Sequence, residues 1–296
     1  MAAAAAAAAR KGVAYTVGRG LYLALTDRTN SRTVVASRGP GFVMSRESNF
    51  SPLGGQGAAE PSATELAAVV DRAYDGLDIV GMGENDPGVT FAGLGEPLLR
   101  METIVETIAT VRERRFVASL RSSRRSLALA AHRRLLFCAS ASVLFLLSAL
   151  TTYHMRDRRI ASTIRARRHG VPFRVMTSGL FSPDVAAALA EAGMNTATVD
   201  LVAQDPSAYA AVMRRHRHSP PNPTSNGGIG GVTSSANMTL QEDGHGVVCA
   251  FIATLAERGV EVECTVVNEP GVETAAARAL AFDLGAVRFR AREYFP

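Results

Sequence analysis

Strand-length apolar segments alternate with helix-length segments along most of the chain, and this alternation is the feature that most constrains the fold. Strands separated by helices of this length are typical of parallel βαβ units. The predicted strands cover residues 21–25, 89–92, 173–177, 196–201, 262–267 and 286–290, and the predicted helices cover residues 63–74, 102–115, 183–192, 247–258 and 273–284. About six such units predict an α/β fold, specifically a partial (βα)6 TIM-like barrel of parallel strands.

Several helix ends carry recognisable capping signals. Ser62 precedes the helix 63–74, and Glu65 lies three residues after Ser62, which is the capping-box pattern. Ser182 and Pro183 open the helix 183–192, and Gly193 ends it. In barrels and in open α/β sheets alike, ligands bind at the carboxyl ends of the strands, so candidate functional residues are sought there.

Two segments interrupt the alternation and set the predicted domain layout. Residues 116–168 are rich in arginine around an apolar core, and residues 216–243 are rich in Ser, Asn, Pro and Gly without an apolar period. The second segment is predicted to be a disordered loop. Residues 1–14 form an Ala-rich leader that is also predicted to be disordered. The barrel is then predicted over residues 15–115 and 169–296.

Residues 116–168 are interpreted as an insertion foreign to the barrel. Without them, the helix ending at residue 115 would run through His169 and Gly170 into the next strand, which is an ordinary helix-stop connection. Retained intronic sequence is the favoured explanation, and a true surface insertion or a membrane anchor over residues 135–150 are the alternatives. The apolar core is shorter than the roughly 20 residues of a membrane span. A span would also separate the two halves of the sheet, so membrane association is not expected.

The charge distribution argues against nucleic acid as a partner. The formal net charge is +5, but residues 112–168 contain 14 arginines and only two acidic residues, and the rest of the chain is acidic. A basic surface spread over the folded domain is therefore not predicted. The three cysteines, Cys138, Cys249 and Cys264, are widely spaced and provide no disulfide framework. This usage favours a reducing compartment, and a cytoplasmic location is predicted.

The clearest local signal is the turn Gly93-Leu94-Gly95-Glu96-Pro97, which follows the predicted strand 89–92. Glycines in such a turn allow a ligand to approach the backbone, and the turn directs Glu96 across the strand ends. A carboxylate in that position can accept hydrogen bonds from a ligand ammonium group. The alternative is a tight βα turn with a solvated glutamate, which is the commoner role of a Gly-Glu-Pro string.

Six motifs occur in a family-like order: LYLALTDR at 21–28, RGPGF at 38–42, GLGEPLLR at 93–100, MTSGL at 176–180, VVNEPGV at 266–272 and FRAREY at 289–294. Together they resemble radical S-adenosylmethionine (SAM) proteins, specifically the TatD-linked branch. Apart from the two interrupting segments, the resemblance runs from Tyr15 to Tyr294. It implies a partial (βα)6 barrel, in agreement with the alternation, and a SAM site at the strand ends.

The resemblance implies seven cofactor-binding residues at the ends of three strands: Gly93, Gly95, Glu96, Pro97, Thr177, Ser178 and Asp200. The first four match the family motif that holds the methionine amino group of SAM. The threonine and the serine fall where the third barrel strand ends and faces the cofactor. The aspartate lies at the end of the fourth strand, which is another common contact position in the family.

The family motif that holds the 4Fe–4S cluster is missing. Its spacing, Cys-x3-Cys-x2-Cys after the first strand, falls here on Thr29, Thr33 and Ala36. Hydroxyl and methyl groups do not replace soft thiolates on iron, so no metal site is predicted there. Cys249 and Cys264 lie on a later helix and strand, where packing is the usual role of cysteine. Without the cluster, the family's reductive cleavage of SAM has no electron source.

The sequence therefore predicts a radical-SAM-like barrel protein without radical chemistry. It would bind SAM or a related nucleotide as a small-molecule cofactor, or serve as a scaffold. Two alternatives stay open: an active radical SAM enzyme whose cluster cysteines are obscured by a sequence or gene-model error, and a membrane-anchored interaction protein that uses residues 135–150.

Overall fold

The computed structural model describes residues 9–32, 37–54, 59–74, 88–115, 171–217 and 244–296. The chain divides into two compact units. The first contains residues 1–75, 87–110 and 172–296, and it holds all the strands found in the described residues. The second contains residues 76–86 and 111–171, of which only 111–115 and 171 are described.

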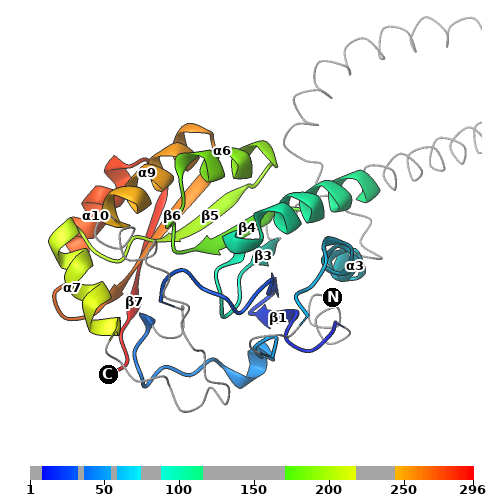
Figure 1. The fold of residues 1–296 in the computed structure, drawn as a ribbon, viewed down its shortest axis with the longest axis horizontal. Coiled ribbons are helices and arrows are strands. Elements are labelled where there is room, and N and C mark those ends of the chain that lie inside the picture. The colour runs from blue at the N-terminus through cyan, green and yellow to red at the C-terminus, as the bar shows by residue number, and fades with distance from the viewer. Residues whose placement is uncertain (1–8, 33–36, 55–58, 75–87, 116–170, 218–243) are drawn as a thin grey trace, which may run out of the picture. The chain divides into compact units, whose positions relative to one another are not determined.

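A single sheet of seven strands forms the centre of the first unit (Figure 1). The strands are β1 (Ala14–Val17), β2 (Gly20–Leu23), β3 (Val89–Phe91), β4 (Phe173–Thr177), β5 (Thr196–Asp200), β6 (Glu261–Asn268) and β7 (Arg288–Glu293), and they lie in the sheet in this order. β1 and β2 form an antiparallel hairpin, and every later pair is parallel. Among the described strands, β1 and β7 do not pair with each other, so the sheet is not closed.

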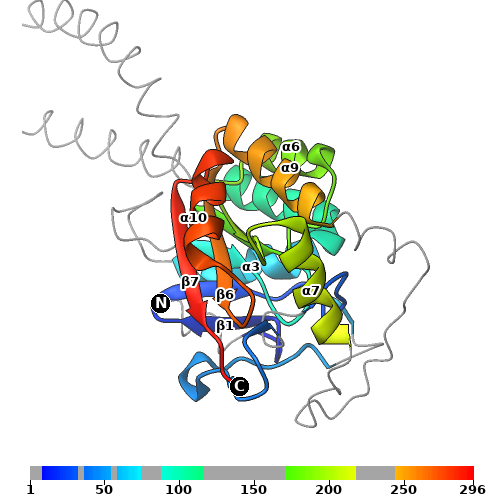
Figure 2. The same cartoon turned by 90° about the vertical axis from the view of Figure 1, so that its left-hand side faces the viewer.

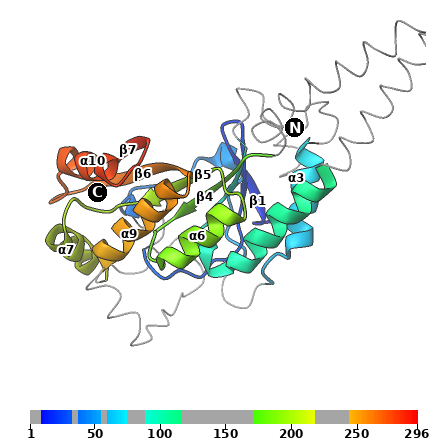
Figure 3. The ribbon, with the colours of Figure 1, turned by 90° about the horizontal axis from the view of Figure 1, so that it is seen from above.

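Helices connect the parallel strands. They are α3 (Ala63–Tyr74), a helix over residues 101–115, α6 (Pro183–Glu191), α7 (Pro206–Arg217), α9 (Gly244–Glu257) and α10 (Thr274–Asp283). Two short 3-10 helices, η1 (Arg46–Ser48) and η2 (Pro97–Arg100), lie in the connections. α6 and α9 pack side by side (Figure 3). α10 packs against β6 and β7 (Figure 2).

The two faces of the parallel sheet differ in chemistry. One face carries the apolar side chains of each strand, including Phe91, Phe173 and Val199, which are fully buried. The rings of Phe91 and Phe173 stack with centroids 5.6 Å apart. Val199 meets Val248 and Phe251 of α9 at Gly179, so this is a face covered by helices. Each fully buried side chain of this size stabilises the fold by about 1.5–3 kcal/mol.

The opposite face is polar. The strand register brings Thr198 of β5 beside Glu263 of β6, and Thr265 of β6 beside Arg290 of β7. The Thr198 hydroxyl donates to Glu263 at 3.4 Å, and Arg290 pairs with Glu263 at 2.8 Å. The Glu263 side chain is only 6% exposed, so these partners offset the cost of burying its charge.

The structure confirms an α/β fold with a mostly parallel sheet, and it locates most predicted elements. β4 and α6 match their predicted positions closely, and the Ser62 hydroxyl accepts the Glu65 N–H as the capping box requires. Two elements were missed, β1 and α7, and β7 begins two residues later than predicted. In α7 the apolar residues Tyr209, Val212 and Met213 follow helical spacing and are buried, a signal that the Arg-rich end of the helix obscured.

The structure also bears on the chain ends and interruptions. Val13 is fully buried and Arg10 pairs with Glu65, so residues 10–14 pack against the unit, unlike the predicted leader. Residues 1–8 and the predicted insertion 116–168 lie outside the described residues, as does 218–243 of the predicted loop. No helix within the described ranges is long and apolar enough to cross a membrane, and residues 135–150 are not among them.

Candidate functional site

The chain that leaves β2 crosses the carboxyl ends of the parallel strands. We call residues 26–32 and 37–42 the β2 segment. Its first residues lie at the end of β3, where the N–H groups of Gly95 and Glu96 donate to the carbonyls of Thr26 and Arg28 at 3.2 and 2.8 Å. The edge at which ligands bind in α/β sheets is therefore occupied by the β2 segment from its first residues onward.

The β2 segment then reaches the later strands in order. Asn30 contacts the end of β4 through the Leu180 carbonyl and the Ser178 hydroxyl, each at 3.3 Å. Arg32 pairs with Glu269 beyond β6 at 2.7 Å. Arg38 donates through Nε to the Glu293 carbonyl of β7 at 2.8 Å. One stretch of chain thus touches the ends of β3, β4, β6 and β7.

Glu96 joins the ends of β3 and β4. Its Oε1 accepts the Leu98 N–H at 3.1 Å and caps η2, and its Oε2 accepts the Ser178 N–H at 2.8 Å. The residue is 4% exposed, so the alternative of a solvated glutamate is wrong. Burial raises the pKa of the Glu96 carboxyl, and the backbone hydrogen bonds of Ser178 and Leu98 offset this rise only in part.

The glycines of the β3 turn are required by the chain itself. A Cβ at Gly95 would meet the carbonyl oxygens of Arg28 and Thr26, and a Cβ at Gly93 would press on Ala24. The sequence analysis expected a ligand to approach the backbone of this turn, but in the structure the β2 segment approaches it. Pro97 is buried as the first residue of η2.

The other predicted residues fall into two groups. Thr177 and Ser178 lie beside Glu96, and the Thr177 hydroxyl accepts the Gly179 N–H at 3.1 Å. Asp200 belongs to a different cluster, because its Oδ2 lies 3.9 Å from Nη2 of Arg32. The structure thus brings Glu96, Thr177 and Ser178 together and places Asp200 among basic residues.

We call the second group the Arg32 cluster: Arg32, Asp200, Tyr209, Glu269 and Arg292. The Arg32 and Glu269 side chains are 4% and 3% exposed, and that of Asp200 is 24% exposed. Burial raises the pKa of the Asp200 carboxyl, whereas the charges of Arg32 and Arg292 lower it. Burial and the neighbouring Asp200 charge raise the pKa of Tyr209 to about 12. These couplings place both guanidinium groups and the tyrosine near one carboxylate.

Sequence reasoning identified Asp200 in this cluster, and it considered an anion site on Arg28, Arg32 and Arg38 but favoured solvated arginines. Glu269 had a usable signal, because it follows a buried strand and precedes Pro270, as Glu96 follows β3 and precedes Pro97. The ion pair of Arg32 had no signal, since its partner Glu269 is 237 residues away in the chain.

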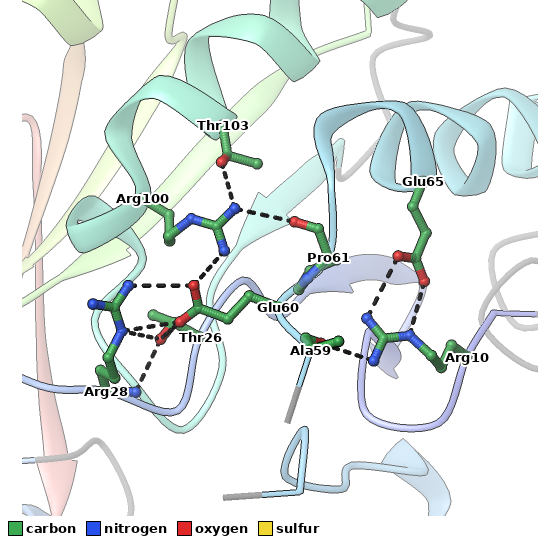
Figure 4. A network of polar contacts seen from close by, with 9 residues as sticks. All are labelled: Arg10, Thr26, Arg28, Ala59, Glu60, Pro61, Glu65, Arg100 and Thr103. Carbon is green, nitrogen blue, oxygen red and sulfur yellow. Dashed lines mark hydrogen bonds and ion pairs between the residues drawn. The ribbon is translucent and has the colours of Figure 1, made fainter. Parts of the chain in front are cut away.

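The Glu60 carboxylate links the β2 segment to η2 through hydrogen bonds (Figure 4). Its carboxylate accepts hydrogen bonds from the Thr26 hydroxyl, from Arg28 Nε at 3.0 Å and from Arg100 Nη1 at 2.6 Å. Arg100 also donates to Thr103 at 2.8 Å. Burial alone would raise the pKa of Glu60, but the hydrogen bonds of Thr26 and Arg28 and the charges of Arg100 and Arg28 lower it below its ordinary value.

The donor set does not fit an iron–sulfur cluster. The Thr29 hydroxyl donates to the Ser31 carbonyl at 2.8 Å, and Thr33 and Ala36 lie outside the described residues. Cys264 is fully buried on β6, and burial raises the pKa of its thiol to about 12. Burial also raises the pKa of Cys249. Iron requires thiolates, which these environments disfavour. Within the described ranges, no group of three or more His, Cys, Asp or Glu side chains is placed to hold a metal ion.

Comparison with models of known protein families and with curated proteins gave no match for this chain.

Replacing Gly95 with alanine is expected to destabilise the fold. Its Cβ would collide with the backbone of the β2 segment, so the free energy of unfolding should fall by about 1–3 kcal/mol. Gly246→Ala is the control, because nothing lies within 4 Å of a Cβ there and alanine favours helix. Chemical denaturation of both variants measures the difference, and equal effects would show that the contact at Gly95 is absent.

Glu60→Gln should lower the free energy of unfolding at pH 7 by about 1–3 kcal/mol, since it weakens charged hydrogen bonds to two arginines. Glu65→Gln is the control, because the Arg10–Glu65 pair is more exposed and exposed pairs contribute less than about 1 kcal/mol. A lowered folded-state pKa means that ionised Glu60 stabilises the fold above the unfolded-state pKa. The effect of the substitution should therefore shrink as the pH falls below about 4. Denaturation at a series of pH values tests this, and a pH-independent loss would contradict it.

Proposed function

We propose that this chain is a radical-SAM-like α/β protein that binds S-adenosylmethionine or a related nucleotide without cluster-dependent chemistry. The strand order supports the barrel part of this proposal. Six parallel strands, β2 to β7, each lie beside the next strand in the sequence, which is the order of a partial (βα)6 barrel. The motif resemblance supplies the class of ligand, and the binding edge is the carboxyl end of β3 and β4.

The buried carboxylate of Glu96 carries the proposal. Two backbone N–H groups and the hydroxyls of Thr177 and Ser178 stabilise it, and all of these donors are neutral, so a ligand ammonium group would supply a charged partner. A cation is the natural complement of a buried carboxylate whose donors are neutral. Thr177 and Ser178 lie beside it, and Asp200 stays a predicted contact whose carboxylate lies near Arg32.

Binding at Glu96 requires the β2 segment to move, because Arg28 and Thr26 cover the β3 turn. Breaking the contacts of Arg28 with Glu60 is then part of the binding free energy and lowers the affinity. Bound SAM would supply a sulfonium centre with a transferable methyl group. The residues at the edge hold and orient this ligand, and no radical step is derived for a donor set without thiolates.

The binding experiment uses the full chain and isothermal titration with SAM. Glu96→Gln should weaken SAM binding about tenfold or more, which is the loss of one charged hydrogen bond. Glu263→Gln is the matched control, because Glu263 is equally buried but lies within β6 and pairs with Arg290. Retention of full SAM affinity in Glu96→Gln, or an absence of SAM binding by the wild type, would contradict the proposal.

A second test measures SAM binding by the wild-type protein, so its outcome does not depend on whether a variant folds. Burial raises the pKa of Glu96, and only the ionised carboxylate attracts the ammonium group, so affinity for SAM should rise with pH through this pKa. 5′-Methylthioadenosine lacks the amino acid part and should show no such rise. Parallel pH profiles for the two ligands would exclude Glu96 as the ammonium acceptor.

The cluster-free part of the proposal has its own test. After anaerobic reconstitution with iron and sulfide, the protein should retain far less than one 4Fe–4S cluster per chain, because the segment aligned with the cluster motif carries no cysteine. Near-stoichiometric iron and sulfide together with SAM cleavage would overturn it and support the radical enzyme.

A further inference from the structure

Arg32 is buried with part of its guanidinium group unsatisfied. Its Nη1 is held by Glu269 at 2.7 Å, but Nε and Nη2 have no hydrogen-bond partner within the described residues. Nε of Arg292 is buried and unpartnered in the same way. Burying a polar group without a partner destabilises the fold, and more so when the group is charged. Such groups in a folded protein call for a specific explanation.

Arg32 and Asp200 do not hydrogen-bond to each other directly. Nη2 of Arg32 and Oδ2 of Asp200 are 3.9 Å apart, which is too long for a direct hydrogen bond. The ion pair with Glu269 fixes the direction of the free N–H groups. Asp200 is the exposed member of the pair, with 24% of its side chain accessible, so the cluster is reached from solvent beside this carboxylate.

The location is that of a ligand site. Asp200 ends β5, Glu269 follows β6, and Arg292 lies near the end of β7. Ligands of α/β sheets bind at the carboxyl ends of the strands. The backbone N–H groups that donate to Glu96 belong to Leu98 and Ser178, which lie outside this cluster.

We propose that the Arg32 cluster binds a small carboxylate that carries a hydroxyl or amino group on the adjacent carbon. The ligand carboxylate accepts the free N–H groups of Arg32 and Arg292, and the adjacent group donates to Asp200. The inference does not rest on SAM binding, because it does not involve Glu96; of the residues predicted to contact SAM, only Asp200 belongs to the Arg32 cluster.

The charges of the cluster favour a monoanion over phosphate. Arg32 faces two carboxylates, Asp200 and Glu269, and the charge of Arg292 acts on Asp200; the two carboxylates would repel a dianion at close range. Planar carboxylates match the fork of an arginine, and Asp200 supplies an acceptor that only a ligand with a donor satisfies. A carboxylate without a donor group should therefore bind more weakly.

The test measures dissociation constants of glycolate, acetate and inorganic phosphate by ligand-observed NMR, with the full chain in buffer free of carboxylates. Glycolate should bind most tightly, acetate should bind several-fold more weakly, and phosphate should be the weakest. Arg32→Lys keeps a charge opposite Glu269 but removes the free N–H groups, so glycolate affinity should fall about tenfold or more.

Arg288→Lys is the matched control, because Arg288 lies at the other end of β7, is exposed and pairs with Glu261. It should leave glycolate affinity unchanged. Should Arg32→Lys fail to fold, Arg292→Lys takes its place and should give the same loss. No binding of glycolate by the wild type, a preference for phosphate, or equal effects of Arg32→Lys and Arg288→Lys would overturn the inference. Glycolate binding should survive Glu96→Gln, which separates this result from the test of SAM binding.

Discussion

The rest of the structure depends on the path of the β2 segment over the carboxyl edge of the sheet. A sheet of six parallel strands that does not close leaves its first and last strands without hydrogen bonds to each other. Here the β2 segment links them, because it leaves β2, passes the ends of β3, β4 and β6, and reaches β7 through Arg38. β2 and β7, the first and last parallel strands, are thus linked through side-chain and backbone contacts rather than through strand pairing.

This path explains residues whose roles are not evident from the sequence. The backbone of Arg28 lies against Gly95 and leaves no space for a side chain there. The Phe295 carbonyl lies against Gly39 in the same way. Arg38 lies over the rings of Phe42 and Phe295, with its guanidinium carbon 4.7 and 5.4 Å from their centroids. These cation–π contacts and the backbone hydrogen bonds of residues 38–41 to Phe295 hold Phe295 against the β2 segment. The motifs RGPGF and FRAREY therefore contact each other across the sheet.

Local patterns predicted the elements, and long-range contacts decided the site. The strand 173–177 and the capping box at Ser62 were predictable, because apolar runs and caps depend on neighbouring residues. The position of Glu96 at a strand end was predictable for the same reason. Its burial was not, because the β2 segment covers it, and the ion pair of Arg32 was not, because its partner Glu269 is 237 residues away. Closure of the sheet depends on the whole chain, so a repeated βα pattern indicates strand order but not whether the ends meet.

Glu96 and Glu269 each come after a strand and precede a proline, but the groups that surround their carboxylates differ in charge. Glu96 is held by neutral backbone N–H groups, which leave its charge uncompensated and its pKa raised by burial. Glu269 is compensated by Arg32, which lies between the positions aligned with the first two cluster cysteines. This segment therefore carries a buried cation, paired with Glu269 just beyond β6. Restoring cysteines at 29, 33 and 36 would leave this ion pair in place, so rebuilding a cluster site would require Arg32 and Glu269 to change as well.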